Sequence, residues 1–277
     1  MSRLFDCCRV GNLQGVETAI ESGEHVNQSA ENGNTPLHIA IMQNHIEMVE
    51  YLLMKGANIN QAANNGDTPL TLACEYGHYT EIIKLLLDNG AEVNHAKKYG
   101  ITPLLLAIRC GSEKMIKILL EHGADVNQVN RSTPLIWAID HRSICIVAML
   151  LAYGAQVNKC NYDGFSPLIM AIRTGQTYTI NILLNNGVNV NQGDSYGNCP
   201  LMYAIQSKYP EYVQTLLDHG AIATHVGSDH QTPLLYAKRC RDKYCEHIIQ
   251  IHIYNMLLDT GLNVLPGDIL REIINYL

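Results

Sequence analysis

The sequence predicts an all-α fold in which one pair of helices is repeated along the chain. Three observations support this prediction. A Thr-Pro or similar step recurs about every 33 residues, an Ala stands four residues after each such proline, and each repeat closes on Leu-Leu and a nearby Gly. A period this regular is typical of a solenoid, in which each unit packs against its neighbours. The prolines of the series are Pro36, Pro69, Pro103, Pro134, Pro167, Pro200 and Pro233.

The residue before each of these prolines predicts where the first helix of a repeat begins. A Thr or Ser side chain there can accept a backbone N–H as an N-cap, and the fixed φ of Pro suits the first helical position. The small Ala within the helix allows a second helix to approach closely. The expected caps are Thr35, Thr68, Thr102, Thr133, Ser166 and Thr232, and Cys199 takes this position in the sixth repeat.

A glycine after each Leu-Leu pair predicts where the second helix ends. Gly readily adopts the left-handed conformation that closes many helices. Short polar steps such as Asn32-Gly33, Asn65-Gly66 and Asp163-Gly164 then predict tight hairpin turns between repeats. The expected closing residues are Gly56, Gly90, Gly123, Gly154, Gly187, Gly220 and Gly261.

This pattern resembles the ankyrin repeat, whose signature of roughly 33 residues centres on Thr-Pro-Leu-His-x-Ala. Residues 35–40 read TPLHIA and match every specified position, whereas the other repeats keep Pro-Leu and Ala but replace the His. We expect those repeats to be looser because they lack the polar bonds of the imidazole. The resemblance implies an ankyrin-repeat domain over residues 1–263, with an N-terminal cap at 1–34 and repeats starting near 35, 68, 102, 133, 166, 199 and 232.

Two irregularities interrupt the period. The hairpin between Asn127 and Thr133 is two residues shorter than the hairpin between Asn60 and Thr68 and lacks its Gly, which predicts a notch in the stack. In the last repeat, the Ala-to-Leu spacing is eight residues longer than in the first, which predicts an insertion within 238–256. We expect the regular array to end there.

Composition argues against several classes of partner and compartment. The net charge of -7 provides no positive field for nucleic acid or an anionic membrane. The longest apolar tract, residues 144–155, is too short to span a bilayer, and no apolar run at the N-terminus suggests a secretory signal. The nine scattered cysteines are not spaced like a disulfide scaffold. We therefore expect a cytoplasmic monomer that binds neither nucleic acid nor membrane.

Catalysis is not expected, because titratable residues that are far apart in the sequence of a linear stack are also far apart in space. No nucleophile elbow, phosphate-binding glycine loop or HExxH motif is present. We therefore predict no enzyme activity, no cofactor and no bound metal. The insertion contains four Cys and His residues of the kind that bind zinc, but their spacing does not match that of a zinc finger. Four basic residues near them are predicted to lie on a solvated helix face. These two groups are Cys240, Cys245, His247 and His252, and Lys238, Arg239, Arg241 and Lys243.

Ankyrin stacks present hairpin tips and the exposed side of each first helix on a concave surface, where side chains are free to vary. Aromatic and Arg residues gather at these positions in the middle of the chain, and such residues dominate protein-binding hot spots. We therefore predict that this surface binds a target protein. Trp137, in contrast, is aligned with Ile39, Leu72 and Ile169 and is predicted to be core. The predicted target-binding residues are Tyr76, Tyr99, Arg109, Tyr162, Phe165, Arg173 and Tyr196.

Residues 264–277 predict a short C-terminal helix with one apolar stripe. This segment is similar to the first helix of an F-box, as in the PRANC arrangement of poxviral host-range proteins and ankyrin effectors of intracellular bacteria. A full F-box continues well beyond one helix, whereas the sequence given stops there. The resemblance implies docking to a Skp-type adaptor of a cullin ubiquitin ligase through Leu265, Pro266, Ile269, Leu270, Ile273, Ile274 and Leu277.

Two alternatives to this function stay open. The C-terminal helix could act only as a lid on the last repeat, which would leave a binding protein that sequesters its target without recruitment. A SOCS-box-like ending that uses residues 244–258 with the Leu-Pro step would recruit elongins instead. The sequence names neither the target nor the source organism.

Overall fold

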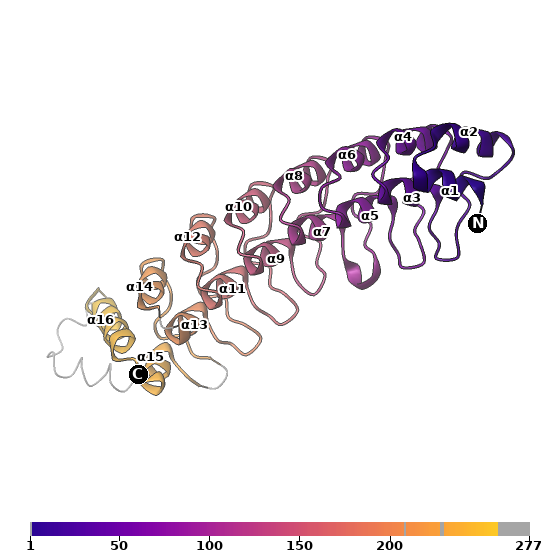
Figure 1. Cartoon of the computed structure of the whole chain (residues 1–277). Helices are drawn as coiled ribbons and strands as arrows, with labels where there is room; N and C mark the ends of the chain where they lie inside the picture. Colours follow the sequence, from indigo (N-terminus) through magenta and orange to yellow (C-terminus); the bar gives the residue numbers. More distant parts are fainter. Residues whose placement is uncertain (1, 208, 228–229, 260–277) are drawn as a thin grey trace. The chain divides into compact units, whose positions relative to one another are not determined.

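The predicted all-α repeat fold is confirmed. The computed structural model describes residues 2–207, 209–227 and 230–259, and this part of the chain forms sixteen α-helices and one 3-10 helix, without a β-strand. Within each of the two units described below, Figure 1 shows the helices in two rows, with the hairpin loops extending from the row of first helices. The chain divides into two compact units, unit 1 (Met1–Asn130) and unit 2 (Arg131–Leu277).

Unit 1 contains four helix pairs. Its first helices are neighbours of one another in sequence order, and the second helices from α4 onward likewise pack side by side. Its elements are α1 (Arg3–Val10), α2 (Leu13–Glu21), α3 (Pro36–Met42), α4 (Ile46–Met54), α5 (Pro69–Glu75), α6 (Thr80–Asp88), the 3-10 helix η1 (Lys98–Gly100), α7 (Pro103–Arg109) and α8 (Glu113–Glu121).

Unit 2 also contains four described helix pairs, in the same order of first and second helix. Its first helices α9, α11, α13 and α15 follow one another in contact. Its elements are α9 (Pro134–Asp140), α10 (Ile144–Ala152), α11 (Pro167–Arg173), α12 (Thr177–Asn185), α13 (Pro200–Ser207), α14 (Pro210–Asp218), α15 (Pro233–Cys240) and α16 (Lys243–Asp259).

The predicted N-caps are confirmed. In all six repeats with Thr or Ser before the proline, the hydroxyl accepts the backbone N–H three residues later at 3.2–3.4 Å. In the repeat that begins with Cys199, the Met202 N–H donates to the backbone carbonyl of Cys199 instead. The helix α13 still begins at Pro200, because the fixed φ of proline remains.

The predicted helix-closing glycines are confirmed within the described residues, since the six from Gly56 to Gly220 have φ between 73° and 87°. The hairpin glycines also adopt left-handed φ, and two of them lie especially close to the backbone of the next hairpin. A Cβ added at Gly33 would stand 2.6 Å from the backbone nitrogen of Asn64, and one at Gly164 would stand 2.8 Å from that of Ser195. Glycine is therefore required at these tips by space as well as by φ.

A row of asparagines joins successive repeats through the backbone. Asn27 accepts the N–H of Asn58 at 2.6 Å and donates to the carbonyl of Gly56 at 3.0 Å. Asn191 makes the same pair of bonds to Ile222 and Gly220. Acceptor bonds of the same kind run from Asn60 to Glu92, from Asn94 to Asp125 and from Asn158 to Asn189.

The short hairpin predicted between Asn127 and Thr133 contains the boundary between the two units. Arg131 has a φ of 46° and so adopts the left-handed conformation without being glycine. In the last repeat, α16 has 17 residues, whereas α14 has nine. The eight extra residues extend its C-terminal end, because α16 begins ten residues after Pro233 just as α14 begins ten residues after Pro200.

Several sequence predictions lie outside the described residues. These are the closing glycine Gly261, the C-terminal helix over 264–277 and the seven residues predicted to dock onto an adaptor. Among the helices that the structure describes, none has the length and apolarity required to cross a membrane.

Candidate functional site

Unit 2 brings an arginine and two aromatic rings together on the side of its first helices. The Arg173 guanidinium, at the end of α11, lies over the Phe165 ring, with 4.3 Å from Cζ to the ring centroid. The Tyr203 ring on α13 meets the same Phe165 ring edge-on, with 6.1 Å between centroids. Phe165, Arg173 and Tyr203 are called the Phe165 cluster below.

A carboxylate within the next hairpin fixes the position of Tyr203. The Tyr203 hydroxyl donates to Asp194 Oδ2 at 2.5 Å, and the backbone N–H groups of Tyr196 and Asn198 both donate to Asp194 Oδ1 at 2.9 Å. Burial alone would raise the pKa of Asp194, but these hydrogen bonds outweigh burial and hold its pKa below the ordinary value. Burial and the carboxylate together raise the pKa of Tyr203. Asp194 thus stays ionised and accepts a strong bond from the phenol.

Two hollows open on either side of this cluster, with volumes of about 440 Å³ and about 320 Å³. The larger hollow contains apolar side chains from α9 and α11 together with two arginines and two aspartates. It is lined by Arg131, Ser132, Ile136, Trp137, Asp140, Asn161, Asp163, Phe165, Met170 and Arg173. The smaller one is lined by Asn198, Met202, Tyr203, Gln206, Tyr236 and Arg239.

The hairpin tips of unit 2 carry two highly exposed tyrosines. Tyr162 is 87% exposed and Tyr196 is 70% exposed. Of the four unit 2 residues predicted to bind a target, the structure brings Phe165 and Arg173 into direct contact and places Tyr162 and Tyr196 at neighbouring tips.

The three predicted residues of unit 1 have different surroundings. Tyr99 belongs to η1 in a hairpin and is 84% exposed, with a left-handed φ of 65°. Tyr76 is half-covered, because its ring stacks on that of Tyr79 with 4.9 Å between centroids. Arg109 is held by an ion pair with Glu75 at 3.3 Å. Unit 1 therefore presents one open tyrosine and two side chains with intramolecular partners.

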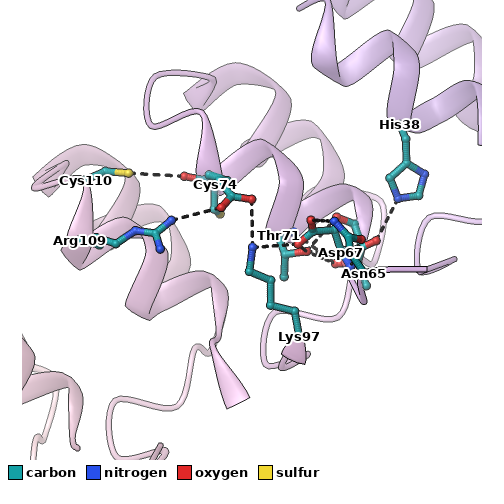
Figure 2. A network of polar contacts seen from close by, with 10 residues as sticks. His38, Asn65, Asp67, Thr71, Cys74, Lys97, Arg109 and Cys110 are labelled. Carbon is teal, nitrogen blue, oxygen red and sulfur yellow. Dashed lines mark hydrogen bonds and ion pairs between the residues drawn. The ribbon is translucent and has the colours of Figure 1, made fainter. Parts of the chain in front are cut away.

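Figure 2 shows a network of polar contacts that includes Asp67, Lys97 and Arg109. Lys97 Nζ lies 2.9 Å from Glu75 Oε2 and 3.0 Å from Asp67 Oδ1. Lys97 therefore joins the hairpin before α7 to the preceding repeat, which holds both carboxylates. Burial would raise the pKa of Glu75, but the hydrogen bonds and charges of Lys97 and Arg109 outweigh it and hold the pKa below its ordinary value. These contacts tie carboxylates to cations and fix the local packing of the repeats.

The prediction that Trp137 belongs to the core is wrong. Its side chain is half-buried, stacks on His141 with 5.8 Å between centroids and lines the larger hollow. Ile39 and Leu72 stand three residues after their prolines, as Trp137 does, and are also only half-buried. The alignment with Ile169 was wrong, because this buried residue stands two residues after its proline. The position three residues after the proline is thus half-buried in most repeats, although Leu106 at this position is fully buried.

The same alignment identifies contact residues that the sequence analysis missed. The position three residues after the proline holds Trp137, Met170, Tyr203 and Tyr236 in unit 2, and all four line a hollow. The position six residues after the proline holds Arg173, Gln206 and Arg239. Large side chains recurring at these two positions were the available signal. Arg239, assigned to a solvated helix face, is exposed but also lines the smaller hollow.

The described residues contain no group of three or more His, Cys, Asp or Glu side chains arranged to hold a metal ion. Cys240 ends α15 and Cys245 is buried in α16, so the two lie on different helices. All nine cysteines are free of disulfide bonds.

A family model and a solved structure both relate this chain to ankyrin-repeat proteins. Three copies of a family model described as ankyrin repeats match residues 4–97, 81–161 and 146–226. The chain is also similar to the crystal structure of the human ASB11 ankyrin repeat domain, with 27% sequence identity and a TM-score of 0.64. That match covers 80% of this chain and 99% of the ASB11 chain. A comparison with curated protein sequences gave no match.

Proposed function

Since the chain belongs to the ankyrin-repeat family, we propose that it binds a target protein on the face formed by its first helices and hairpin tips. Ankyrin repeats serve as protein-binding scaffolds, and the comparisons indicate no catalytic family. The observation that carries the choice of surface is the Phe165 cluster with its two flanking hollows. Aromatic rings and an arginine fixed in place are the groups that contribute most at protein interfaces.

The hairpin tips favour a protein target over a small ligand. Tyr162 and Tyr196 are 87% and 70% exposed on the hairpins that precede α11 and α13, so a partner broad enough to reach the tips would bury both rings. Tyr contributes a large contact area at low cost in side-chain entropy, and its hydroxyl retains polar contacts. Tyr99 offers an equivalent open ring on unit 1.

Affinity purification of the full chain from eukaryotic cells tests this proposal. We expect the triple variant Tyr162→Ala, Arg173→Ala, Tyr196→Ala to lose the proteins that the unmodified chain captures. Tyr178→Ala is the matched control, because Tyr178 is 74% exposed but lies on the second helix α12. Retention of the same proteins by the triple variant, or their loss from the control, would place the binding surface elsewhere.

We further propose that the captured target is delivered to a cullin-type ubiquitin ligase through residues 264–277. This proposal is supported by the F-box-like sequence, in which Leu-Pro-x-Asp-Ile is followed by an apolar helical stripe. In this arrangement the repeats select the target, and the apolar stripe docks into a Skp-type adaptor. The sequestering inhibitor, with the same segment acting only as a lid, is the alternative.

The double variant Ile269→Ser, Ile273→Ser separates recruitment from the lid. Recruitment predicts that the adaptor no longer co-purifies, while target capture and the melting temperature stay unchanged. A lid predicts instead that each substitution removes burial worth about 1.5–3 kcal/mol and that the last repeat frays. Co-purification of elongins in place of a Skp-type adaptor would support the SOCS-box-like alternative.

A further inference from the structure

The position six residues after the proline of each repeat carries different charges in the two units. In unit 1, Glu75 and Arg109 occupy this position in successive repeats and form an ion pair at 3.3 Å. In unit 2, the same position holds Asp140, Arg173, Gln206 and Arg239 in successive repeats. Within the described part of the chain, neither Arg173 nor Arg239 forms an ion pair with a carboxylate.

Arg173 is nevertheless held in place. Its guanidinium lies over the Phe165 ring, Phe165 meets Tyr203, and the Tyr203 hydroxyl is bound to the buried carboxylate of Asp194. A guanidinium on an aromatic ring keeps its N–H donors available at its edges, where a carboxylate can bind two of them at once. Because the support is already ordered, binding there loses little conformational entropy.

Apolar surface adjoins this arginine. The larger hollow begins at Phe165 and Arg173 and continues over Trp137, Ile136 and Met170. A side chain that enters it would bury aromatic and aliphatic surface, while an acidic neighbour in the same segment reaches Arg173. The smaller hollow repeats this combination with Met202, Tyr236 and Arg239.

We infer that unit 2 binds an extended peptide segment of its target in which an Asp or Glu stands next to a large apolar residue. This inference rests on the proposed function and names the chemical class of the partner. The carboxylate pairs with Arg173, and the apolar side chain fills the larger hollow. A doubly charged phosphate fits less well, because Asp140 and Asp163 line the same hollow and would repel it.

Selection of phage-displayed random peptides on the full chain tests the inference. We expect the enriched sequences to share an acidic residue beside Phe, Leu, Ile, Met or Trp. The most enriched sequence is then synthesised with an amidated C-terminus, alongside a version with Asn or Gln in place of the acid and a version with phosphoserine there. Amidation ensures that only side-chain carboxylates contribute. The acidic peptide should bind about ten-fold more tightly than its amide version.

The variant Arg173→Gln should abolish this preference, so that acidic and amide peptides bind alike. Arg9→Gln is the charge-matched control, because Arg9 lies on α1 and pairs with Asp6. Tyr203→Phe keeps the ring but removes its bond to Asp194, and it should reduce the preference without changing the fold.

Three results would overturn the inference. They are enrichment without acidic residues, an acid preference that persists in Arg173→Gln, and tighter binding of the phosphoserine peptide. If no peptide is enriched, the inference also fails, because the surface then does not bind an isolated segment. The capture experiment with the Tyr162, Arg173 and Tyr196 triple variant would still decide whether the same face binds a folded target.

Discussion

At the residue scale, His38 joins two repeats of unit 1 through a neutral imidazole ring. Its Nδ1 accepts the backbone N–H of Thr35 at 3.2 Å, so the ring proton is on Nε2 and is donated to the Asp67 carbonyl at 3.0 Å. The side chain is fully buried, and burial lowers the pKa of His38 below its ordinary value despite the nearby Asp67 groups. A second proton would have to enter at Nδ1, where a donor already points.

The variant His38→Thr should remove a pH-dependent contribution to stability. Because the folded-state pKa of His38 is lowered, its contribution is fully present above the unfolded-state value of 6.5 and is lost as the pH falls below it. We expect the variant to lose about 1 kcal/mol at pH 7.5, the usual contribution of one hydrogen bond. Thr is the matched replacement, since Thr71 occupies this position in the next repeat and completes a capping box.

The measurement is chemical denaturation of both proteins at about pH 7.5 and 5.5, values on either side of an ordinary His pKa. The free energy of unfolding should fall more between these two pH values in the unmodified protein than in His38→Thr. Other titrating groups are common to both proteins and cancel in the comparison. An equal fall would show that His38 contributes nothing to the pH dependence.

At the element scale, the hairpins are limited by space at their tips. Gly33 and Gly56 have nearly the same φ, 81° and 83°, but an added Cβ meets the Asn64 backbone at Gly33 and open space at Gly56. The hairpins also bind one another directly, since the Asn64 N–H donates to the Asn32 carbonyl at 3.1 Å. A hairpin in this unit is therefore shaped by the next hairpin as well as by its own turn.

Substitution of each glycine by alanine separates backbone strain from crowding. Gly56→Ala should cost about 1–2 kcal/mol, because only the left-handed φ is unfavourable for a residue with a Cβ. Gly33→Ala should cost more, because the hairpins must also move apart. Denaturant titration of both variants gives the two values. Equal losses would mean that the tips separate without cost.

At the scale of the whole molecule, the capping interactions differ from one repeat to another. The repeats that begin with Thr35 and Thr68 have complete capping boxes, whereas the next three have only the hydroxyl bond. The repeat that begins with Cys199 has no hydroxyl at this position. Because the stability of a solenoid depends on each repeat and its neighbours, protection should vary along the chain.

Hydrogen exchange followed by mass spectrometry measures this variation. We expect the slowest amide exchange in residues 35–125 and the fastest among the repeats from Cys199 onward. Cys199→Thr should slow exchange in α13 by restoring the cap, which typically contributes about 1 kcal/mol. Uniform protection along the chain would contradict this account.

The repeat fold could be predicted from sequence because it depends on local features that recur, such as Thr35 with Pro36 and the closing Gly56. The surface was harder to predict. Arg173 and Phe165 were identified as exposed candidates, but their contact with Tyr203 depends on how α11 and α13 pack, and Tyr203 itself was missed. Arg109 and Arg173 look equivalent in sequence, yet among the described residues only Arg109 of the two has a carboxylate partner. That difference depends on distances between neighbouring helices, which the residue pattern does not specify.

The asparagine bonds between repeats have a consequence for the history of the gene. Asn27 and Asn191 bind only backbone atoms of the following repeat, and any replacement repeat offers the same N–H and carbonyl groups. Recombination that duplicates or deletes a stretch coding for one whole repeat therefore leaves both partners of such a bond in place. The chain can lengthen or shorten in steps of one repeat without any change to the hydrogen bonds that link successive repeats. Each step would also add or remove one first helix and one hairpin tip from the surface available for selection.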